Sequence, residues 1–179
     1  MKKWCVSWLL GLCVISAGQP GSADVVSKEA GGFQLSFREN TTVGRREVYE
    51  ILVSRFSQWW DPAHTYSGNS RNLSIDLQKS CILENLPGGG FVRHMEVVYY
   101  DPRQAILRLT GGLGPLQEMG VQGAMTFKVM TVDGKTEIQL TYNVVGNSSL
   151  NLDRIAPVVD RVLSEQLARL ADLCNRSSQ

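Results

Sequence analysis

The stretch CILENLPGGGFVRHMEVVYYDP (residues 81–102) carries the pattern that decides the fold. The strand that enters this stretch begins before it, at about residue 73. Side chains alternate across a strand, so its apolar residues Ile75, Leu77, Cys81 and Leu83 all fall on one face. The PGGG segment (87–90) then turns the chain, and residues 91–100 form the returning strand of a hairpin. The sequence therefore predicts an antiparallel sheet built from hairpins.

The segments on either side of this hairpin extend the sheet and add two helices. Residues 33–37 alternate as a strand, and the side chains of 40–42 offer capping oxygens for a helix that ends near Trp60. Further strands are expected at 105–109, 124–132 and 135–145, the last two joined by Asp133-Gly134, a typical hairpin turn.

A long amphipathic helix is predicted over about 153–175. Its expected inward stripe is Ile155, Val159, Val162, Gln166, Leu170 and Leu173. This order of elements predicts an α+β fold, in which a curved antiparallel sheet of about six strands wraps around the C-terminal helix. A sheet curved around a helix tends to leave a cavity between the two.

The first residues are typical of a secretory signal peptide covering residues 1–23. Lys2 and Lys3 precede an apolar run from Trp4 to Ala17, and the small residues 21–23 offer a cleavage site near Ala23. An uncleaved membrane anchor is the alternative, but the apolar run is shorter than the roughly 20 residues that span a bilayer. We therefore expect an exported protein, periplasmic or secreted, with no stable membrane span after processing.

The mature chain is expected to hold a flexible lead-in (24–32) and one domain (33–176). A lipidated Cys13 is disfavoured, because Leu12 stands where a small residue is needed. Lys2 and Lys3 are the only charged residues before Asp24, so cleavage lowers the net charge from +1 to −1. A near-neutral domain without a basic stripe argues against nucleic acid as a partner.

Three further motifs resemble a known group of proteins. The segments FSQWWDPAHTYSG (56–68), LTGGLGPLQEMGVQGAMTF (109–127) and IAPVVDRVLSEQLARL (155–170), together with 81–102, resemble an uncharacterised bacterial exported subgroup of the SRPBCC (START-like) superfamily. This superfamily includes lipid-transfer domains and polyketide cyclase/dehydrase-like proteins. The resemblance implies a helix-grip fold and a cavity for small hydrophobic or amphipathic molecules, but it implies no chemistry, because the superfamily includes carriers, sensors and enzymes.

Five residues are candidates for ligand binding. Trp60 follows Trp59 at the end of the first helix and could close the cavity mouth, while Tyr66 lies in the adjacent turn-rich segment. Met119 belongs to the glycine-rich stretch 111–120, which is expected to form either a mobile apolar flap or a plain loop. Tyr142 and Gln166 place polar groups on inward faces, where each needs a partner.

His64, Glu84 and His94 are candidates for acid–base catalysis. Folding the hairpin brings Glu84 close to opposite His94 and Cys81 near Glu96, although a cross-strand pair on the surface is the default interpretation. Cys81 and Glu84 face opposite sides of a regular strand, and no ligand spacing typical of zinc is present, so we expect no metal site. Cofactors are not indicated, and the sequence leaves open whether Cys81 and Cys174 form a disulfide.

The leading functional hypothesis is binding or transport of a small hydrophobic or amphipathic ligand without catalysis. A cyclase-, dehydratase- or hydrolase-type enzyme that uses His64, His94 or Glu84 is the first alternative. The second is a module whose groove binds a protein segment.

Overall fold

The computed structural model describes residues 22–177. Strands are β1 Ser22–Glu29, β2 Gly32–Thr41, β3 Leu73–Asp76, β4 Cys81–Asn85, β5 Phe91–Asp101, β6 Ile106–Thr110, β7 Gln122–Val132 and β8 Lys135–Val145. Helices are α1 Arg45–Ser54, α2 Phe56–Trp59 and α3 Leu152–Ser177, and short 3-10 turns lie at Pro62–His64, Ser70–Asn72, Gly114–Gln117 and Ser148–Leu150. All but the last two residues of the predicted signal peptide (1–23) lie outside the described residues.

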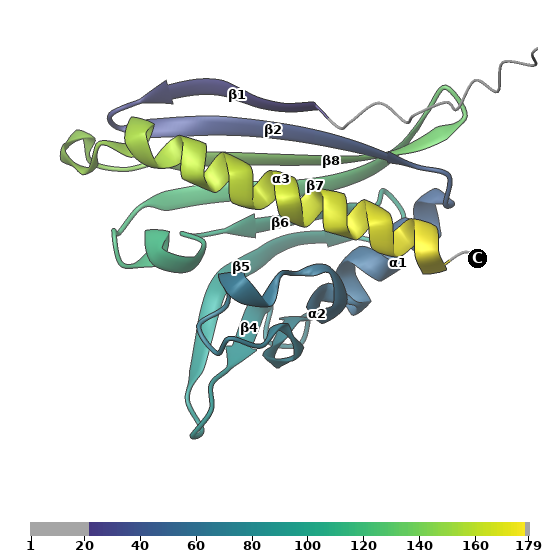
Figure 1. Cartoon of the computed structure of the whole chain (residues 1–179), viewed down its shortest axis with the longest axis horizontal. Helices are drawn as coiled ribbons and strands as arrows, with labels where there is room; N and C mark the ends of the chain where they lie inside the picture. The colour runs from purple at the N-terminus through teal and green to yellow at the C-terminus, as the bar shows by residue number, and fades with distance from the viewer. Residues whose placement is uncertain (1–21, 178–179) are drawn as a thin grey trace, which may run out of the picture.

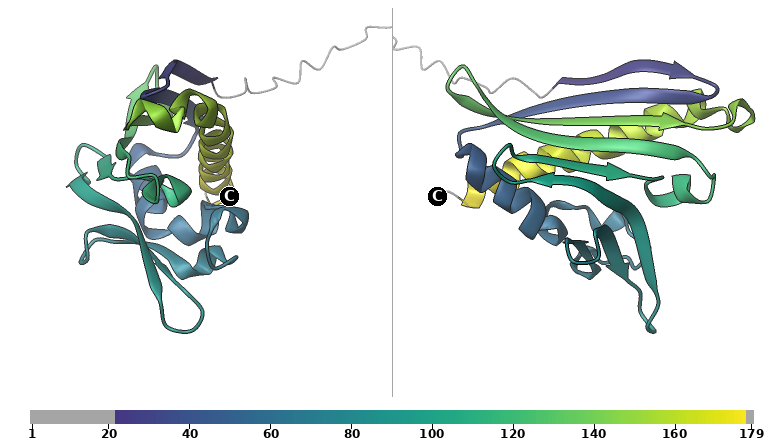
Figure 2. Two further views of the ribbon diagram at one scale, coloured as in Figure 1. Left: turned by 90° about the vertical axis from the view of Figure 1, so that its left-hand side faces the viewer. Right: turned by 180° about the vertical axis from the view of Figure 1, so that it is seen from behind.

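The eight strands form one antiparallel sheet in the order β1-β2-β8-β7-β6-β5-β4-β3 (Figure 1). The end-on view in Figure 2 shows the sheet curving around one side of α3. The expected α+β class, with a curved antiparallel sheet and a long C-terminal helix, is therefore confirmed. Within residues 22–177, no helix is long and apolar enough to cross a membrane.

Two differences raise the strand number above the six expected. Residues 22–29 form β1, of which 24–29 were expected to be flexible, and β1 pairs with β2 along an edge of the sheet. The sequence hides this strand because Val25 and Val26 are both exposed and a register shift follows Val25, so no alternation is visible. The single strand expected over 73–83 is divided into β3 and β4 by a turn, in which the Asp76 carboxylate accepts hydrogen bonds from two backbone amides.

The predicted hairpin at Asp133-Gly134 joins β7 to β8, and both residues have positive φ angles (50° and 76°), as a type I′ turn requires. The start of the first helix differs from expectation. Gly44 is its N-cap and no side chain caps it, because β2 continues through Thr41. The Thr41 hydroxyl instead donates to Asn175 Oδ1 at 2.6 Å and accepts from the Val43 amide, which ties the end of β2 to α3.

The buried stripe of α3 lies one residue further along the chain than predicted. Of the predicted stripe, only Gln166 and Leu170 are fully buried. The buried residues are Leu152, Ala156, Leu163, Gln166, Leu167, Leu170, Ala171 and Cys174. One residue on a helix corresponds to a rotation of about 100°. In this orientation the buried stripe of α3 packs against β1, β2, β8, α1 and α2. The predicted residues Ile155, Val159 and Val162 therefore lie on a second apolar face, which does not pack on the sheet.

Candidate functional site

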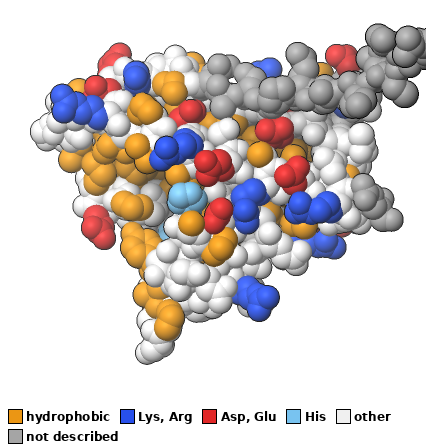
Figure 3. All heavy atoms as spheres, viewed as in Figure 1, with side chains coloured by type: hydrophobic (Ala, Val, Ile, Leu, Met, Phe, Trp, Pro, Cys, Tyr) orange, Lys and Arg blue, Asp and Glu red, His pale blue; other side chains and the backbone are white. Residues whose placement is uncertain are grey.

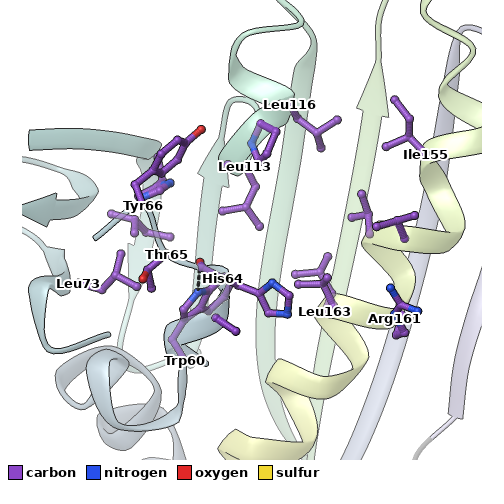
Figure 4. Close-up of a pocket in the computed structure, with 18 of the residues that line it drawn as sticks. Trp60, His64, Thr65, Tyr66, Leu73, Leu113, Leu116, Ile155, Arg161 and Leu163 are labelled. Carbon is purple, nitrogen blue, oxygen red and sulfur yellow. Dashed lines mark hydrogen bonds between the residues drawn. The ribbon is translucent and has the colours of Figure 1, made fainter. Parts of the chain in front are cut away.

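A cavity of about 530 Å³ lies between the first half of α3, the segment after α2, and the loop that leads from β6 to β7. Figure 4 shows Trp60 and His64 on one side of this space, Leu113 and Leu116 on another, and side chains of α3 on a third. Most of its wall is apolar. The apolar lining residues are Phe56, Trp60, Ala63, Leu73, Ile82, Leu113, Pro115, Leu116, Met119, Ile155, Val158, Val159, Val162 and Leu163.

The cavity exists because α3 has apolar residues on two neighbouring faces. One face packs on the sheet, and the second, carrying Ile155, Val158, Val159 and Val162, faces the cavity. Val158 remains 53% exposed, so its burial is left to whatever fills or covers this space. On the face of the molecule crossed by α3, hydrophobic side chains gather at the surface (Figure 3).

Three of the five predicted ligand-binding residues line the cavity: Trp60, Tyr66 and Met119. Trp60 is 5% exposed, stacks on Phe56 with ring centroids 5.2 Å apart, and donates its indole N–H to the His64 carbonyl at 3.0 Å. This hydrogen bond fixes the path of the segment that forms the cavity mouth. Trp59 packs in the core and donates its indole N–H to the Leu52 carbonyl.

Tyr142 does not line the cavity. Its hydroxyl donates to the Gly111 carbonyl at 3.2 Å and accepts from the Leu113 amide at 3.1 Å, while burial raises its pKa to about 12. The hydroxyl therefore clamps the start of the glycine-rich segment to β8. Gln117, at the other end of this segment, donates to the backbone carbonyls of Arg93 and His94. The segment is thus a wall of the cavity, held at both ends.

Gln166 also lies outside the cavity lining, and its partner is the protein. Its Oε1 accepts from the Asp61 amide at 2.7 Å, and its buried Nε2 has no hydrogen-bond partner among residues 22–177. One turn later, Arg169 donates to the Trp59 carbonyl at 2.9 Å and lies 3.4 Å from the Asp61 carboxylate. Together Gln166 and Arg169 fasten the segment after α2 onto α3.

Glu84 and His94 form a buried pair, so the surface pair expected from the sequence is wrong. His94 Nε2 lies 2.8 Å from Glu84 Oε2, and the two side chains are 5% and 0% exposed. In the register, Cys81 faces Glu96 as predicted, but Glu84 faces Val92, because a β-bulge in β5 inserts His94 as an additional residue. The bulge turns His94 toward the cavity.

The Glu84 carboxylate is held by the loop above it. Oε1 accepts from the Ser67 amide at 2.6 Å, and Oε2 accepts from the Tyr66 amide at 3.2 Å. Burial by itself would raise the pKa of Glu84, but hydrogen bonds from Ser67, His94 and the Tyr66 amide outweigh it and lower the pKa below the ordinary 4.5. Glu84 is therefore an anion at neutral pH.

This depressed pKa makes a prediction for stability against pH. Because the folded pKa lies below the unfolded value, the carboxylate contributes stability that is fully present above about pH 4.5 and is lost as the pH falls through the folded pKa. The difference in unfolding free energy between wild type and Glu84→Gln should thus be constant just above about pH 4.5 and shrink in more acidic solution. Urea titrations on both sides of this pH measure the difference, with Glu96→Gln, at an exposed position of β5, as the baseline.

His64 and Arg161 are exposed and lie at the cavity mouth. His64 projects toward α3, to the side where Arg161 stands (Figure 4). Sequence reasoning missed Arg161, since a charged residue on a helix is ordinarily solvated. Among residues 22–177, no three His, Cys, Asp or Glu side chains are placed to hold a metal ion, and no disulfide joins the two buried cysteines, Cys81 and Cys174.

No family model matches the sequence, and no curated protein matches it significantly. Solved structures do. Ara h 8.0201 superposes with a TM-score of 0.55 at 11% identity, over 80% of this chain and 98% of that one. The chain has the Bet v 1-like helix-grip fold.

Two bacterial proteins superpose equally well. One from Arthrobacter aurescens gives a TM-score of 0.56 at 12% identity, over 87% of this chain and 91% of that one. One from Staphylococcus epidermidis gives 0.55 at 16% identity, over 86% and 94%. At these identities the likeness shows the fold alone, which agrees with the fold that the SRPBCC resemblance implied.

Proposed function

We propose that this protein binds a small hydrophobic or amphipathic molecule in the cavity beside α3. The observation that carries the proposal is the second apolar face of α3, where Ile155, Val159 and Val162 face an open space instead of the sheet. Ligand pockets typically enclose about 300–1,000 Å³ and are mostly apolar, with a few polar groups that orient the ligand. The cavity, at about 530 Å³, has both features.

The mouth favours an amphipathic ligand over a purely apolar one. Arg161 and His64 lie at the opening, where a polar or anionic group of the ligand would remain in contact with water. The N-terminal sequence supports binding in the periplasm or outside the cell. N-terminal sequencing of protein recovered from cell fractions tests this location, and a full-length chain in the cytoplasm would contradict it.

Native mass spectrometry of the mature protein, gently purified from its natural compartment, tests the binding proposal. We expect an additional mass that is reproducible and disappears on denaturation. A bare protein mass, together with no binding of apolar fluorescent probes by the purified protein, would contradict the proposal.

Filling the cavity should abolish this binding. Val159→Trp places a large ring in the space without removing a packing contact from the sheet side of α3, so we expect probe affinity to fall at least about tenfold with little loss of stability. Glu165→Trp is the matched control, because Glu165 is exposed on the same helix and does not line the cavity. Equal affinities for the two variants would show that the probe binds elsewhere.

The buried Glu84–His94 pair favours a second candidate, an enzyme that uses acid–base chemistry. An imidazole oriented by a carboxylate is a common arrangement for a general base. If the protein is an enzyme, incubation with the molecule extracted from it should yield a product of different mass or structure. A double variant Glu84→Gln/His94→Phe should yield none, and an unchanged ligand with wild-type protein would contradict catalysis.

A further inference from the structure

We propose that His94, oriented by Glu84, binds a hydroxyl group of the molecule that occupies the cavity. The inference deepens the proposed function and rests on it. It names the polar group of the ligand and the place in the cavity where that group lies, at the bulge in β5.

In this pair Glu84 positions the imidazole and His94 contacts the ligand. Glu84 is completely buried and does not line the cavity, whereas His94 does. The carboxylate is fixed by hydrogen bonds from the Tyr66 and Ser67 amides, and it is hydrogen-bonded to Nε2 of His94 at 2.8 Å. A carboxylate accepts hydrogen bonds and so fixes the N–H at Nε2. Nδ1 is then the ring nitrogen that remains for a ligand.

A hydroxyl group suits this nitrogen in either protonation state. A neutral imidazole with its proton on Nε2 has a lone pair on Nδ1, to which a hydroxyl can donate. A charged imidazole has an N–H there, from which the same hydroxyl can accept. A ligand carbonyl would match the charged form alone, because it cannot donate.

A ligand carboxylate is disfavoured here by charge. Within residues 22–177 the ion pairs give Glu84 no cationic partner except His94, so a second carboxylate at Nδ1 would leave net negative charge in an apolar cavity. Burial, and after it the negative charge of nearby Glu118, raises the pKa of the Tyr66 phenol. Tyr66 lies against His94 with ring centroids 5.7 Å apart, so Glu118 adds further negative potential at this place. Burying an uncompensated charge is strongly unfavourable.

The surroundings of His94 make this hydrogen bond selective. The residues that line the cavity together with His94 include the apolar Leu73, Ile82 and Leu113. A site that hydrogen-bonds a hydroxyl rejects an analogue that lacks it, because the buried polar group is then left without a partner. The inferred ligand class is an apolar ring or chain molecule with one neutral hydroxyl group, phenolic or alcoholic.

The test compares two fluorescent probes that differ in one group, β-naphthol and its methyl ether. Wild-type protein should bind the naphthol about fivefold to tenfold more tightly, the factor expected for one hydrogen bond. Equal affinities, with both abolished by Val159→Trp, would overturn the hydroxyl inference and leave the proposed function standing. If neither probe binds, both the hydroxyl inference and the proposed function are contradicted.

A double variant Glu84→Gln/His94→Phe assigns the preference to this pair. The glutamine retains an oxygen for the Tyr66 and Ser67 amides and removes the charge that loss of the imidazole would strand. Affinity for the naphthol should drop to that for the ether, while affinity for the ether is retained. Glu96→Gln is the control, because Glu96 is exposed on the same strand and does not line the cavity, and it should preserve the ratio. A naphthol preference that survives in the double variant would overturn the inference.

Discussion

A Glu84→Ala variant is expected to lose about 3 kcal/mol of unfolding free energy, a large fraction of the stability of a domain of this size. The truncation removes three hydrogen bonds at once: from His94 and from the Tyr66 and Ser67 amides. Each buried donor left without a partner costs about 1–3 kcal/mol, of which water entering the loop recovers part. The midpoint of urea unfolding measures the loss.

The control for this prediction is Glu96→Ala. Glu96 is an exposed residue of β5, directly opposite Cys81, so its truncation should change stability by no more than about 0.5 kcal/mol. A Glu84→Ala variant as stable as Glu96→Ala would contradict the view that this carboxylate holds the loop. The same loop carries Tyr66 over His94, so a loss of stability should be accompanied by weaker binding in the cavity.

The order of elements could be predicted from the sequence because periodicity and turns are local. The Asp133-Gly134 turn and the change from alternating to helical spacing each depend on a few neighbouring residues. β1 escaped prediction because an edge strand is held by backbone hydrogen bonds, which leave no apolar alternation when both valines are exposed.

The rotation of α3 could not be predicted from its own pattern. Apolar residues occupy two adjacent faces of this helix, and the sequence does not say which face packs on the sheet. The presence of a second apolar face on this helix is itself informative. A helix that covers a sheet needs one apolar stripe, so a second stripe of Ile155, Val158, Val159 and Val162 indicates a cavity or an interface.

The site polar groups were predicted with mixed success for a related reason. Alternation in β4 and β5 suggested a pair on the surface, and the bulge that turns His94 inward leaves no sequence mark. Tyr142 and Gln166 were predicted to face inward and are buried, yet the hydrogen bonds that they make are to backbone groups of loops distant in sequence. Such loop contacts are tertiary, and a single sequence does not reveal them.

Gly123→Ala is expected to destabilise the protein by about 1–3 kcal/mol and to weaken binding in the cavity. A methyl group on Gly123 would collide with the Gly111 carbonyl and approach the Tyr142 hydroxyl to 2.9 Å. Neither the Gly111 carbonyl nor the Tyr142 hydroxyl can move away without losing hydrogen bonds. The Gly111 amide donates to the Gly123 carbonyl, and the Gly111 carbonyl accepts from the Tyr142 hydroxyl. The collision should therefore push the glycine-rich wall off the Tyr142 clamp and displace Leu113 and Leu116 from the cavity.

Thermal unfolding and affinity for a fluorescent probe measure these two effects separately. Gly44→Ala is the matched control, since nothing lies within 4 Å of a methyl group at that position and its φ of −61° suits alanine. Tyr142→Phe separates the two causes, because it releases the clamp without the collision: it should weaken binding with a smaller loss of stability. A Gly123→Ala protein with the stability and affinity of Gly44→Ala would show that the wall does not depend on this close approach of backbones.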